Sequence, residues 1–298
     1  MPLANIERLN CFVEVADTLS FSRAAQNLHL SQPAVSRYIK ELERATGTRL
    51  FDRVGRKVAL TETGALLLER ARKVKQSVEE LEADAEGLSG RMAGQLQLGG
   101  STVWEYLLPR VIGSFTSAHP GIRIMLAVAN TGEIIDWLDQ SRIHLGFVGD
   151  APGGRSLDAT PIAEDRLVIV APAQHPLAKR RKVRPADLSG FAYVQREANS
   201  ATARIAARYL AELGVVPQTT LELGSHEAVK SGVRAGLGLG IISRYAIAEE
   251  VALGSLVEIR LDAPPCLRPL YVLRNPARAY SAPQKAFIAH VLTAFRKS

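Results

Sequence analysis

Two closely spaced helix start signals, at Ser20 and Ser31, most constrain what this chain can fold into. Serine is a favoured N-cap, and Pro33 falls in the first turn of the second helix, where its missing N–H costs nothing. Apolar residues recur at helical spacing around both signals, and Gly47 ends the second helix. A short helix, a tight turn and a longer helix predict a helix-turn-helix.

A pair of short strands follows these helices. Leu50-Phe51 and Val58-Ala59-Leu60 flank a basic turn, residues 52–57, that contains Gly55. This pattern predicts a wing beside the helices. The alternative is an ordinary helical hairpin with a solvated charged face. The capped turn, the wing and its basic tip occur together, which favours DNA binding.

The residue types on this segment suit base and phosphate recognition. A recognition helix presents its N-terminal residues to base edges in the major groove, where Gln pairs with adenine and Arg with guanine. Cations of a wing bind phosphates or enter the minor groove. The predicted DNA-binding residues are Ser22, Arg23, Ser31, Gln32, Pro33, Ser36, Arg37, Lys40, Arg53, Arg56 and Lys57.

A long helix is expected after Thr61, ending near Ser89-Gly90. Its apolar residues alternate at spacings of four and three, the pattern of two helices packed on each other. We expect this seam to hold a homodimer or homotetramer; the alternative is one amphipathic helix packed on its own core. The seam residues are Leu67, Ala71, Val74, Val78, Leu81, Ala85 and Leu88.

From residue 95 onward, predicted strands and helices alternate, which indicates α/β units with a mostly parallel sheet. The run is long for one sheet, so we expect two α/β lobes. The resulting division is a winged helix-turn-helix over 1–61, a linker helix over 62–90 and an α/β domain over 91–298.

Charge is distributed unevenly along the chain. The net charge is +7, made up of +3 over residues 1–61, −3 over 62–90 and +7 over 91–298. Excess positive charge favours polyanionic partners. No stretch is apolar enough to span a membrane and the start shows no secretory signal, so we expect a cytoplasmic protein without a membrane partner.

A ligand site is predicted where strands of the α/β domain end. Open α/β sheets bind ligands beyond the carboxyl ends of their strands, and helix N-termini there favour anions. Small polar residues stand at four such ends. The alternative is plain helix capping by the same residues. A small anion is the expected ligand; a neutral or aromatic ligand stacked on Trp104 is the competitor.

The chain resembles the LysR-type transcriptional regulators. The resemblance lies in ordered motifs of the first 64 residues and continues to the end of the chain. They include Phe12–Ala16, Ser20–Ala25, Leu30–Arg37, Ile39–Glu43, Gly47–Phe51, Leu60–Gly64, Leu107–Pro109, Phe115 with His119-Pro120, Asp187-Leu188 and Gly236–Gly240.

The resemblance implies a winged helix, a linker helix and two subdomains like those of periplasmic binding proteins. Subdomain I would span about 95–165 and 270–298, and subdomain II about 166–269. It also implies double-stranded promoter DNA, a small effector and RNA polymerase as partners. Effector contacts of the family fall on the strand-end loops, and the predicted residues are Ser101, Thr102, Trp104, Asn130, Thr131, Gly149, Glu197, Ser200, Thr202, Ser225 and Glu227.

A narrower branch, which includes regulators of carbon dioxide fixation and of sulfur assimilation, is similar at 196–202, 224–230 and 242–244. That branch usually has glycine at 199 and 201 and arginine at 203. This chain has Asn199, Ala201 and Ala203, with Arg204 one place late, so a different effector stays open.

Enzyme chemistry finds no support in the sequence. Gly236–Gly240 lacks the spacing of a dinucleotide motif, no nucleophile elbow occurs, and the histidines and the two cysteines show no metal-ligand spacing. We therefore predict no catalytic residues, metal or cofactor. The basic run 179–184 is expected to be a solvated loop, with a second DNA contact as the alternative. A transport solute-binding protein, or an enzyme with an accessory DNA-binding domain, remain the other two classes.

Overall fold

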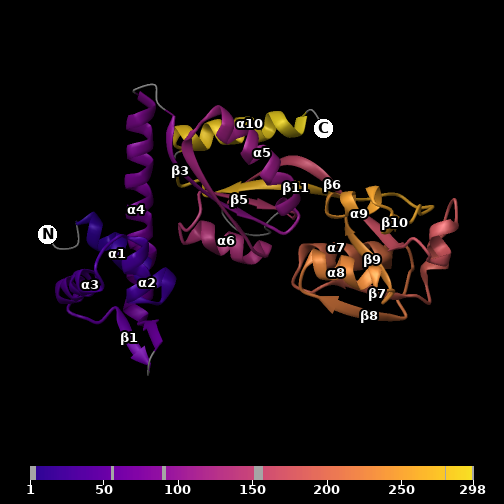
Figure 1. Cartoon of the computed structure of the whole chain (residues 1–298), viewed down its shortest axis with the longest axis horizontal. Helices are drawn as coiled ribbons and strands as arrows, with labels where there is room; N and C mark the ends of the chain where they lie inside the picture. The colour runs from indigo at the N-terminus through magenta and orange to yellow at the C-terminus, as the bar shows by residue number, and fades with distance from the viewer. Residues whose placement is uncertain (1–4, 55–56, 89–91, 151–156, 279, 297–298) are drawn as a thin grey trace. The chain divides into compact units, whose positions relative to one another are not determined.

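The computed structural model describes residues 5–54, 57–88, 92–150, 157–278 and 280–296 (Figure 1). The chain forms two compact units. Unit 1 comprises residues 1–94 with 140–142, and unit 2 comprises 95–139 with 143–298. None of the described helices is both long and apolar enough to span a membrane.

Unit 1 begins with the predicted helix-turn-helix. The hydroxyl of Ser20 accepts a hydrogen bond from the backbone N–H of Arg23, and that of Ser31 accepts one from Ala34, both at 3.3 Å. Gly47, with φ of 68°, takes the left-handed conformation that ends the second helix. The three helices are α1 (Ile6–Thr18), α2 (Phe21–Asn27) and α3 (Gln32–Thr46).

The wing follows as β1 (Phe51–Val54) and β2 (Lys57–Leu60), which pair antiparallel with Phe51 opposite Leu60. The ring of Phe51 packs edge-on against Phe12 and Phe21, so the first strand is anchored in the core of the helices. The predicted winged helix is therefore confirmed.

The long helix α4 (Glu62–Leu88) carries the predicted seam. The first part of α4 packs on the core of the winged helix. Ala71 is buried in that core, and Leu67 lies against it. Farther along, Val74 is 47% exposed and Leu81 is 69% exposed. Val78 is half-buried and Ala85 exposed, while the side chain of Leu88 lies outside the described residues.

Unit 2 is an α/β domain with two lobes. We call lobe I the half that contains β3 (Ala93–Gly100), α5 (Trp104–Ala118), β4 (Gly121–Val128), α6 (Thr131–Asp139), β5 (Leu145–Val148) and α10 (Ala282–Arg296). We call lobe II the half that contains β7 (Ala192–Arg196), α7 (Ala201–Glu212), β8 (Thr219–Leu223), α8 (His226–Arg234), β9 (Leu239–Ser243), α9 (Ala248–Ala252) and β10 (Leu256–Glu258). Single-turn helices lie at Pro176–Lys179, Pro185–Leu188 and Arg244–Ile247.

Two long strands, β6 (Asp158–Pro172) and β11 (Cys266–Arg274), run through both lobes. The sheet order is β4-β3-β5-β11-β6-β9-β7-β8, with β10 paired to β6. Strand β11 joins β5 at Tyr271–Leu273, so the chain returns to lobe I along this strand.

The expectation of a mostly parallel sheet is wrong in the middle of unit 2. β3–β5, β7–β8 and β7–β9 are parallel, but β11 pairs antiparallel with β5 and β6, and β6 pairs antiparallel with β9 and β10. The physical reason is the crossing: the chain leaves lobe I along β6 and returns along β11, so the two strands must run in opposite directions.

Candidate functional site

The predicted recognition surface lies on the first half of α3. Gln32, Arg37 and Lys40 are exposed, and Ser36 is half-buried. The amide of Gln32 donates to the Ser36 hydroxyl at 3.2 Å. Arg37 has 65% of its side chain exposed, and its Nε lies 4.0 Å from Glu41. These weak, exposed contacts leave the side chains free to exchange for base contacts.

The remaining predicted DNA-binding residues divide into two groups. Ser22, Arg23, Ser31 and Pro33 are exposed on α2 and at the start of α3, and the Ser31 hydroxyl is already occupied as the cap. The other group is the wing tip and consists of Arg53, Arg56 and Lys57. The side chains of Arg53 and Lys57, and the whole of Arg56, lie outside the described residues.

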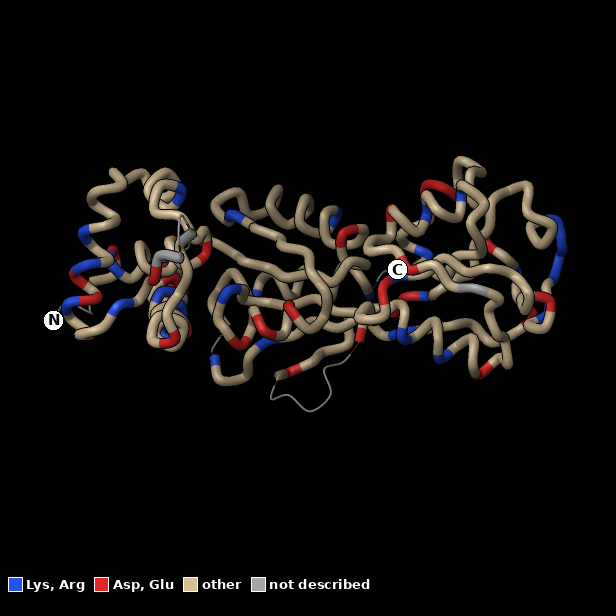
Figure 2. The backbone as a smooth tube through the Cα atoms, turned by 90° about the horizontal axis from the view of Figure 1, so that it is seen from below, with Lys and Arg blue, Asp and Glu red and all other residues tan. Residues whose placement is uncertain are grey.

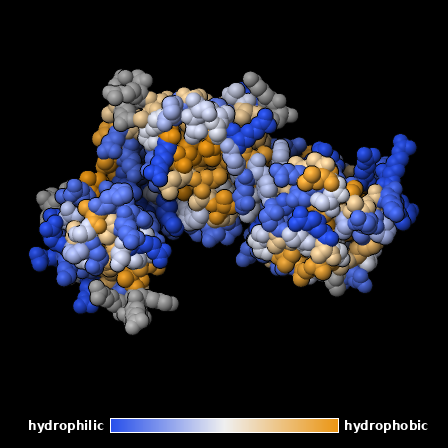
Figure 3. Space-filling view, in the orientation of Figure 1, coloured by the Kyte–Doolittle hydropathy of each residue, from blue (hydrophilic) through white to orange (hydrophobic). Residues whose placement is uncertain are grey.

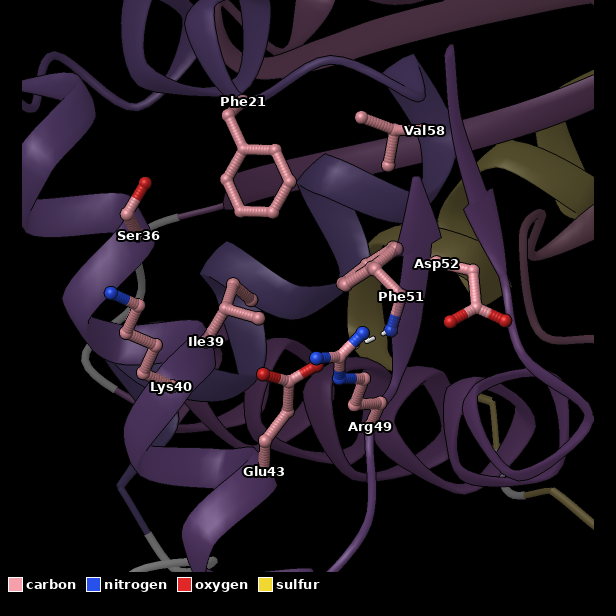
Figure 4. A pocket seen from close by; sticks show the side chains of 9 residues that line it. All are labelled: Phe21, Ser36, Ile39, Lys40, Glu43, Arg49, Phe51, Asp52 and Val58. Atoms are coloured by element: carbon pink, nitrogen blue, oxygen red, sulfur yellow. Dashed lines mark hydrogen bonds between the residues drawn. The ribbon is translucent and has the colours of Figure 1, made fainter. Parts of the chain in front are cut away.

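A cavity of about 540 Å³ separates the recognition helix from the wing (Figure 4). One lining residue, Glu43 of α3, bonds to the start of the wing. Its Oε1 accepts hydrogen bonds from the backbone N–H groups of Leu50, at 2.8 Å, and Phe51, at 3.4 Å. This carboxylate ties the helix to the first wing strand. The cavity is lined by Phe21, Ser36, Ile39, Lys40, Glu43, Arg49, Phe51, Asp52 and Val58, and Arg49 was not among the predicted residues.

A second, polar cavity lies in unit 2, where loops of both lobes meet. It brings together six of the predicted effector residues: Ser101, Thr102, Asn130, Thr131, Ser200 and Thr202. It also brings in two arginines that the sequence analysis did not assign, Arg196 and Arg268, each 3% exposed. Two buried guanidinium groups thus supply a fixed positive charge that the sequence did not assure, because Arg204 stands one place late in its motif.

Arg196 stands at the carboxyl end of β7. Its Nε and Nη2 donate to the Glu197 carboxylate at 2.8 and 2.7 Å, and its Nη1 donates to the Thr102 hydroxyl of lobe I at 2.9 Å. Glu197 thereby orients the guanidinium rather than lining the cavity. Arg204 forms its contacts elsewhere, with the Asn199 carbonyl and Asp150.

Arg268 reaches the cavity from β11. Its Nε donates to Asp165 of β6 at 2.8 Å and its Nη1 to the Thr202 hydroxyl at 3.0 Å, while Ser243 donates to the other Asp165 oxygen at 2.9 Å. A Cβ on Gly149 would lie 3.3 Å from Nη1 of Arg268. Gly149 therefore leaves room for the guanidinium, and it is not among the residues that line the cavity.

Part of the predicted set caps helices, which was the alternative interpretation. The Ser200 hydroxyl accepts from the N–H of Ala203, Ser225 accepts from Ala228, and the Asn130 side chain accepts from Glu133, at 3.0 to 3.2 Å. Ser225 does not line the cavity as described. The Thr131 hydroxyl, by contrast, is buried and has no hydrogen-bond partner among the described residues.

Trp104 does not form the aromatic wall of the effector cavity that one interpretation of the sequence expected. It is fully buried and packs edge-on against Phe147 and Phe295, with ring centroids 5.2 and 5.7 Å away. As the first residue of α5, it points into the core of lobe I and not into the cavity. A stacking role for it in ligand binding is therefore excluded by its position.

A buried polar cluster lies next to the cavity. His226 is 2% exposed, and burial together with the positive charges of Arg196, Arg268 and Lys230 lowers its pKa to about 3. The Lys230 ammonium sits between the carboxylates of Glu227 and Glu250, at 2.6 and 2.7 Å. Glu227 therefore contributes to this cluster and does not line the cavity.

An exposed recognition helix beside a wing, joined to a two-lobed α/β domain with a polar cavity, defines a ligand-responsive DNA-binding regulator. Residues 6–65 match the model of the bacterial regulatory helix-turn-helix protein, lysR family, and residues 89–296 match that of the LysR substrate binding domain. The chain belongs to the LysR family of transcriptional regulators.

Relatives place the chain in the carbon fixation branch of that family. It is 34% identical over 289 residues to the RuBisCO operon transcriptional regulator of Allochromatium vinosum, which covers 97% of this chain and 96% of that protein. It is 32% identical over 292 residues to the transcriptional regulator CbbR of Rhodospirillum rubrum, covering 98% and 97%.

Solved structures agree with this fold. The CcmR regulatory domain of Synechocystis PCC6803 in complex with 2-PG has a TM-score of 0.64 and 27% identity, covering 68% of this chain and 97% of that one. Full-length OxyR of Pseudomonas aeruginosa has a TM-score of 0.75 at 22% identity, covering 98% and 94%, which supports the fold alone.

Proposed function

We propose that this regulator controls genes of carbon dioxide fixation in response to a small anion bound in the polar cavity of unit 2. The target genes are inferred from the relatives. The effector class is inferred from one observation above all: two buried guanidinium groups, Arg196 and Arg268, line a single cavity together with the hydroxyls of Thr102 and Thr202.

The arginines retain capacity to bind an anion. A guanidinium carries five N–H donors, and the hydrogen bonds of Arg196 to Glu197 and Thr102 use three of them. The positive end of α7 and the unpaired hydroxyl of Thr131 add further donors. The carboxylates that pair with the arginines fix their orientation, so a ligand meets preorganised donors.

The size of the cavity limits how an effector enters. Its volume is about 20 Å³, close to the space that one water molecule occupies. A larger anion such as 2-PG, which the CcmR domain binds, therefore requires lobes I and II to move apart. An effector that favours the separated arrangement shifts the population toward it, which is the coupling that regulation needs.

Binding is tested by titrating the full chain with 2-PG, inorganic phosphate, sulfate, short carboxylates and benzoate while following the melting temperature. We expect an anion to raise the melting temperature, and Thr102→Val and Thr202→Val to weaken the effect. Thr220→Val, an exposed position on β8, is the matched control. Full affinity in both cavity variants would show that the anion binds elsewhere, and a response to uncharged ligands alone would exclude an anionic effector.

For the assembly, we infer a cytoplasmic homodimer or homotetramer that holds two winged helices on a two-fold related promoter site and acts on RNA polymerase. The exposed apolar residues Val74 and Leu81 on α4 support self-association through the predicted seam. We retain the division into 1–61, 62–90 and 91–298 and propose no catalytic step. Family membership disfavours both the transport protein and the enzyme.

A further inference from the structure

A loop of lobe II carries five exposed cations that neither the winged helix nor the effector cavity uses. Figure 2 shows most of it as a blue stretch at the right of the view. We call it the basic loop, and it consists of Lys179, Arg180, Arg181, Lys182 and Arg184.

The backbone of the basic loop is anchored to lobe II by buried residues and by backbone hydrogen bonds. Val183, in its middle, is fully buried; its N–H donates to the Arg260 carbonyl at 2.9 Å, and its carbonyl accepts from the N–H of Asp262 at 2.7 Å. Leu177 and Leu188 are buried on either side. These buried apolar residues fix the backbone of the loop, and the five charged side chains are exposed to solvent.

The charges of the basic loop are only partly balanced. Arg180 and Arg184 share the carboxylate of Asp187, at 3.3 and 3.2 Å, and Lys182 lies 2.6 Å from Asp262. Lys179 and Arg181 form no ion pair with any carboxylate among the described residues. Five cations against two carboxylates leave a net charge of +3 on this surface.

We propose that the basic loop binds the phosphate backbone of DNA within the regulator's own complex, without reading sequence. Arginine presents a fork that matches phosphate, and the exposed ion pairs with Asp187 and Asp262 cost little to release. The run from 179 to 184 contains no Asn or Gln to pair with adenine and no aromatic residue to stack on bases, and cations on an exposed loop suit phosphate contacts. DNA is the polyanion that this family already binds, so it is the partner the charge fits best.

The test uses the full chain and random-sequence duplexes, one short and one long, because phosphate contacts do not depend on an operator. The variant is Lys179→Ser with Arg181→Ser. Each lost phosphate contact should reduce the slope of log K against log salt by about 0.9, so the double variant should lower the slope by nearly 2 on the long duplex.

The matched control is Arg123→Ser with Lys285→Ser, two exposed cations of lobe I, because it removes the same charge from another surface. We expect the control to keep more of the slope than the basic-loop variant, with both melting as the wild type does. Equal loss in the two double variants would overturn the proposal in favour of a net-charge effect. An unchanged slope in the basic-loop variant would also overturn it and leave an acidic protein surface as the partner to examine.

Discussion

The hydroxyl of Tyr106 on α5 donates to the Glu227 carboxylate on α8 at 3.1 Å, so a side chain of lobe I is bonded to lobe II outside the effector cavity. The Tyr106 ring also packs against the apolar core of lobe II, and the Lys230 ammonium lies 5.5 Å from its centre. The two lobes are thus joined by a polar contact and an apolar contact in addition to the bond between Arg196 and Thr102.

Removing this hydroxyl should loosen the contact between the lobes. Tyr106→Phe loses one hydrogen bond to a carboxylate that is 64% exposed, so we expect the free energy of unfolding to fall by about 1 kcal/mol or less. Urea unfolding of the full chain measures it. Tyr193→Phe is the control, because that hydroxyl is buried without a partner among the described residues. An equal loss in both variants would contradict the role of the Glu227 bond.

His226 should make the protein sensitive to acid. Its pKa lies near 3 when folded and near 6.5 when unfolded, so the unfolded state binds a proton first as the pH falls. The stability of the fold therefore decreases between about pH 6.5 and pH 3, by about 2 kcal/mol at pH 5 from this group alone.

His226→Gln removes the titrating group. We expect the free energies of unfolding of wild type and variant to converge as the pH is lowered from 7 to 5, because only the wild type incurs this loss. Urea titrations at pH 7, 6 and 5 measure the difference. A difference that stays constant over this range would show that His226 does not carry the acid sensitivity.

Arg37 should matter for DNA and not for folding. Its side chain is exposed, so Arg37→Ala leaves the core intact, and losing one paired base contact costs about 1–3 kcal/mol of specific binding, or roughly 5- to 150-fold in affinity. A mobility-shift assay on an operator measures this loss. Arg44→Ala, exposed in the last turn of the same helix, is the control. The role is wrong if Arg37→Ala binds as tightly as Arg44→Ala.

Leu81→Asp should separate the subunits. It places a charge in the predicted seam, where burial without a partner is strongly unfavourable. Light scattering should show smaller species, and DNA binding should fall although Leu81 touches no base. Ser77→Asp adds the same charge at an exposed position off the seam and should leave the assembly intact. A fully oligomeric Leu81→Asp protein would show that association occurs elsewhere.

Local signals in the sequence were sufficient for most helices and strands, although α9 and β10 were not predicted. Ser20, Ser31, Ser200 and Ser225 are all N-caps in the structure, because capping depends only on residues three positions away. The first half of β6, over 158–166, was not predicted. Its pattern is broken by Pro161 and by charged residues, and its strand conformation comes from pairing with β11, far along the chain.

The two arginines of the cavity differ in how far the sequence could have revealed them. Arg196 follows the apolar residues of β7 at a carboxyl strand end, so the rule that located the serines and threonines could have included it. Arg268 carries no local signal. It reaches the cavity only because β11 pairs with β6, which places its guanidinium on Asp165. The spacing of residues near Arg268 does not predict such a long-range strand pairing.

The return of the chain along β11 also affects when each lobe can be completed during synthesis, because β11 is made after most of lobe II. Apart from the first half of β11, lobe II is built from one continuous stretch between β6 and β10. Lobe I needs the second half of β11 beside β5, and it needs α10, whose Phe287 packs edge-on against Phe115 of α5 (Figure 1). The apolar face of lobe I that α10 covers is therefore open until α10 has left the ribosome. Figure 3 shows how much apolar surface remains on the face of this lobe turned to the viewer even in the finished chain. A nascent chain arrested before β11 would lack a strand that both lobes use and the helix that covers lobe I, and such unpaired strand edges and open apolar faces make incomplete chains prone to aggregation.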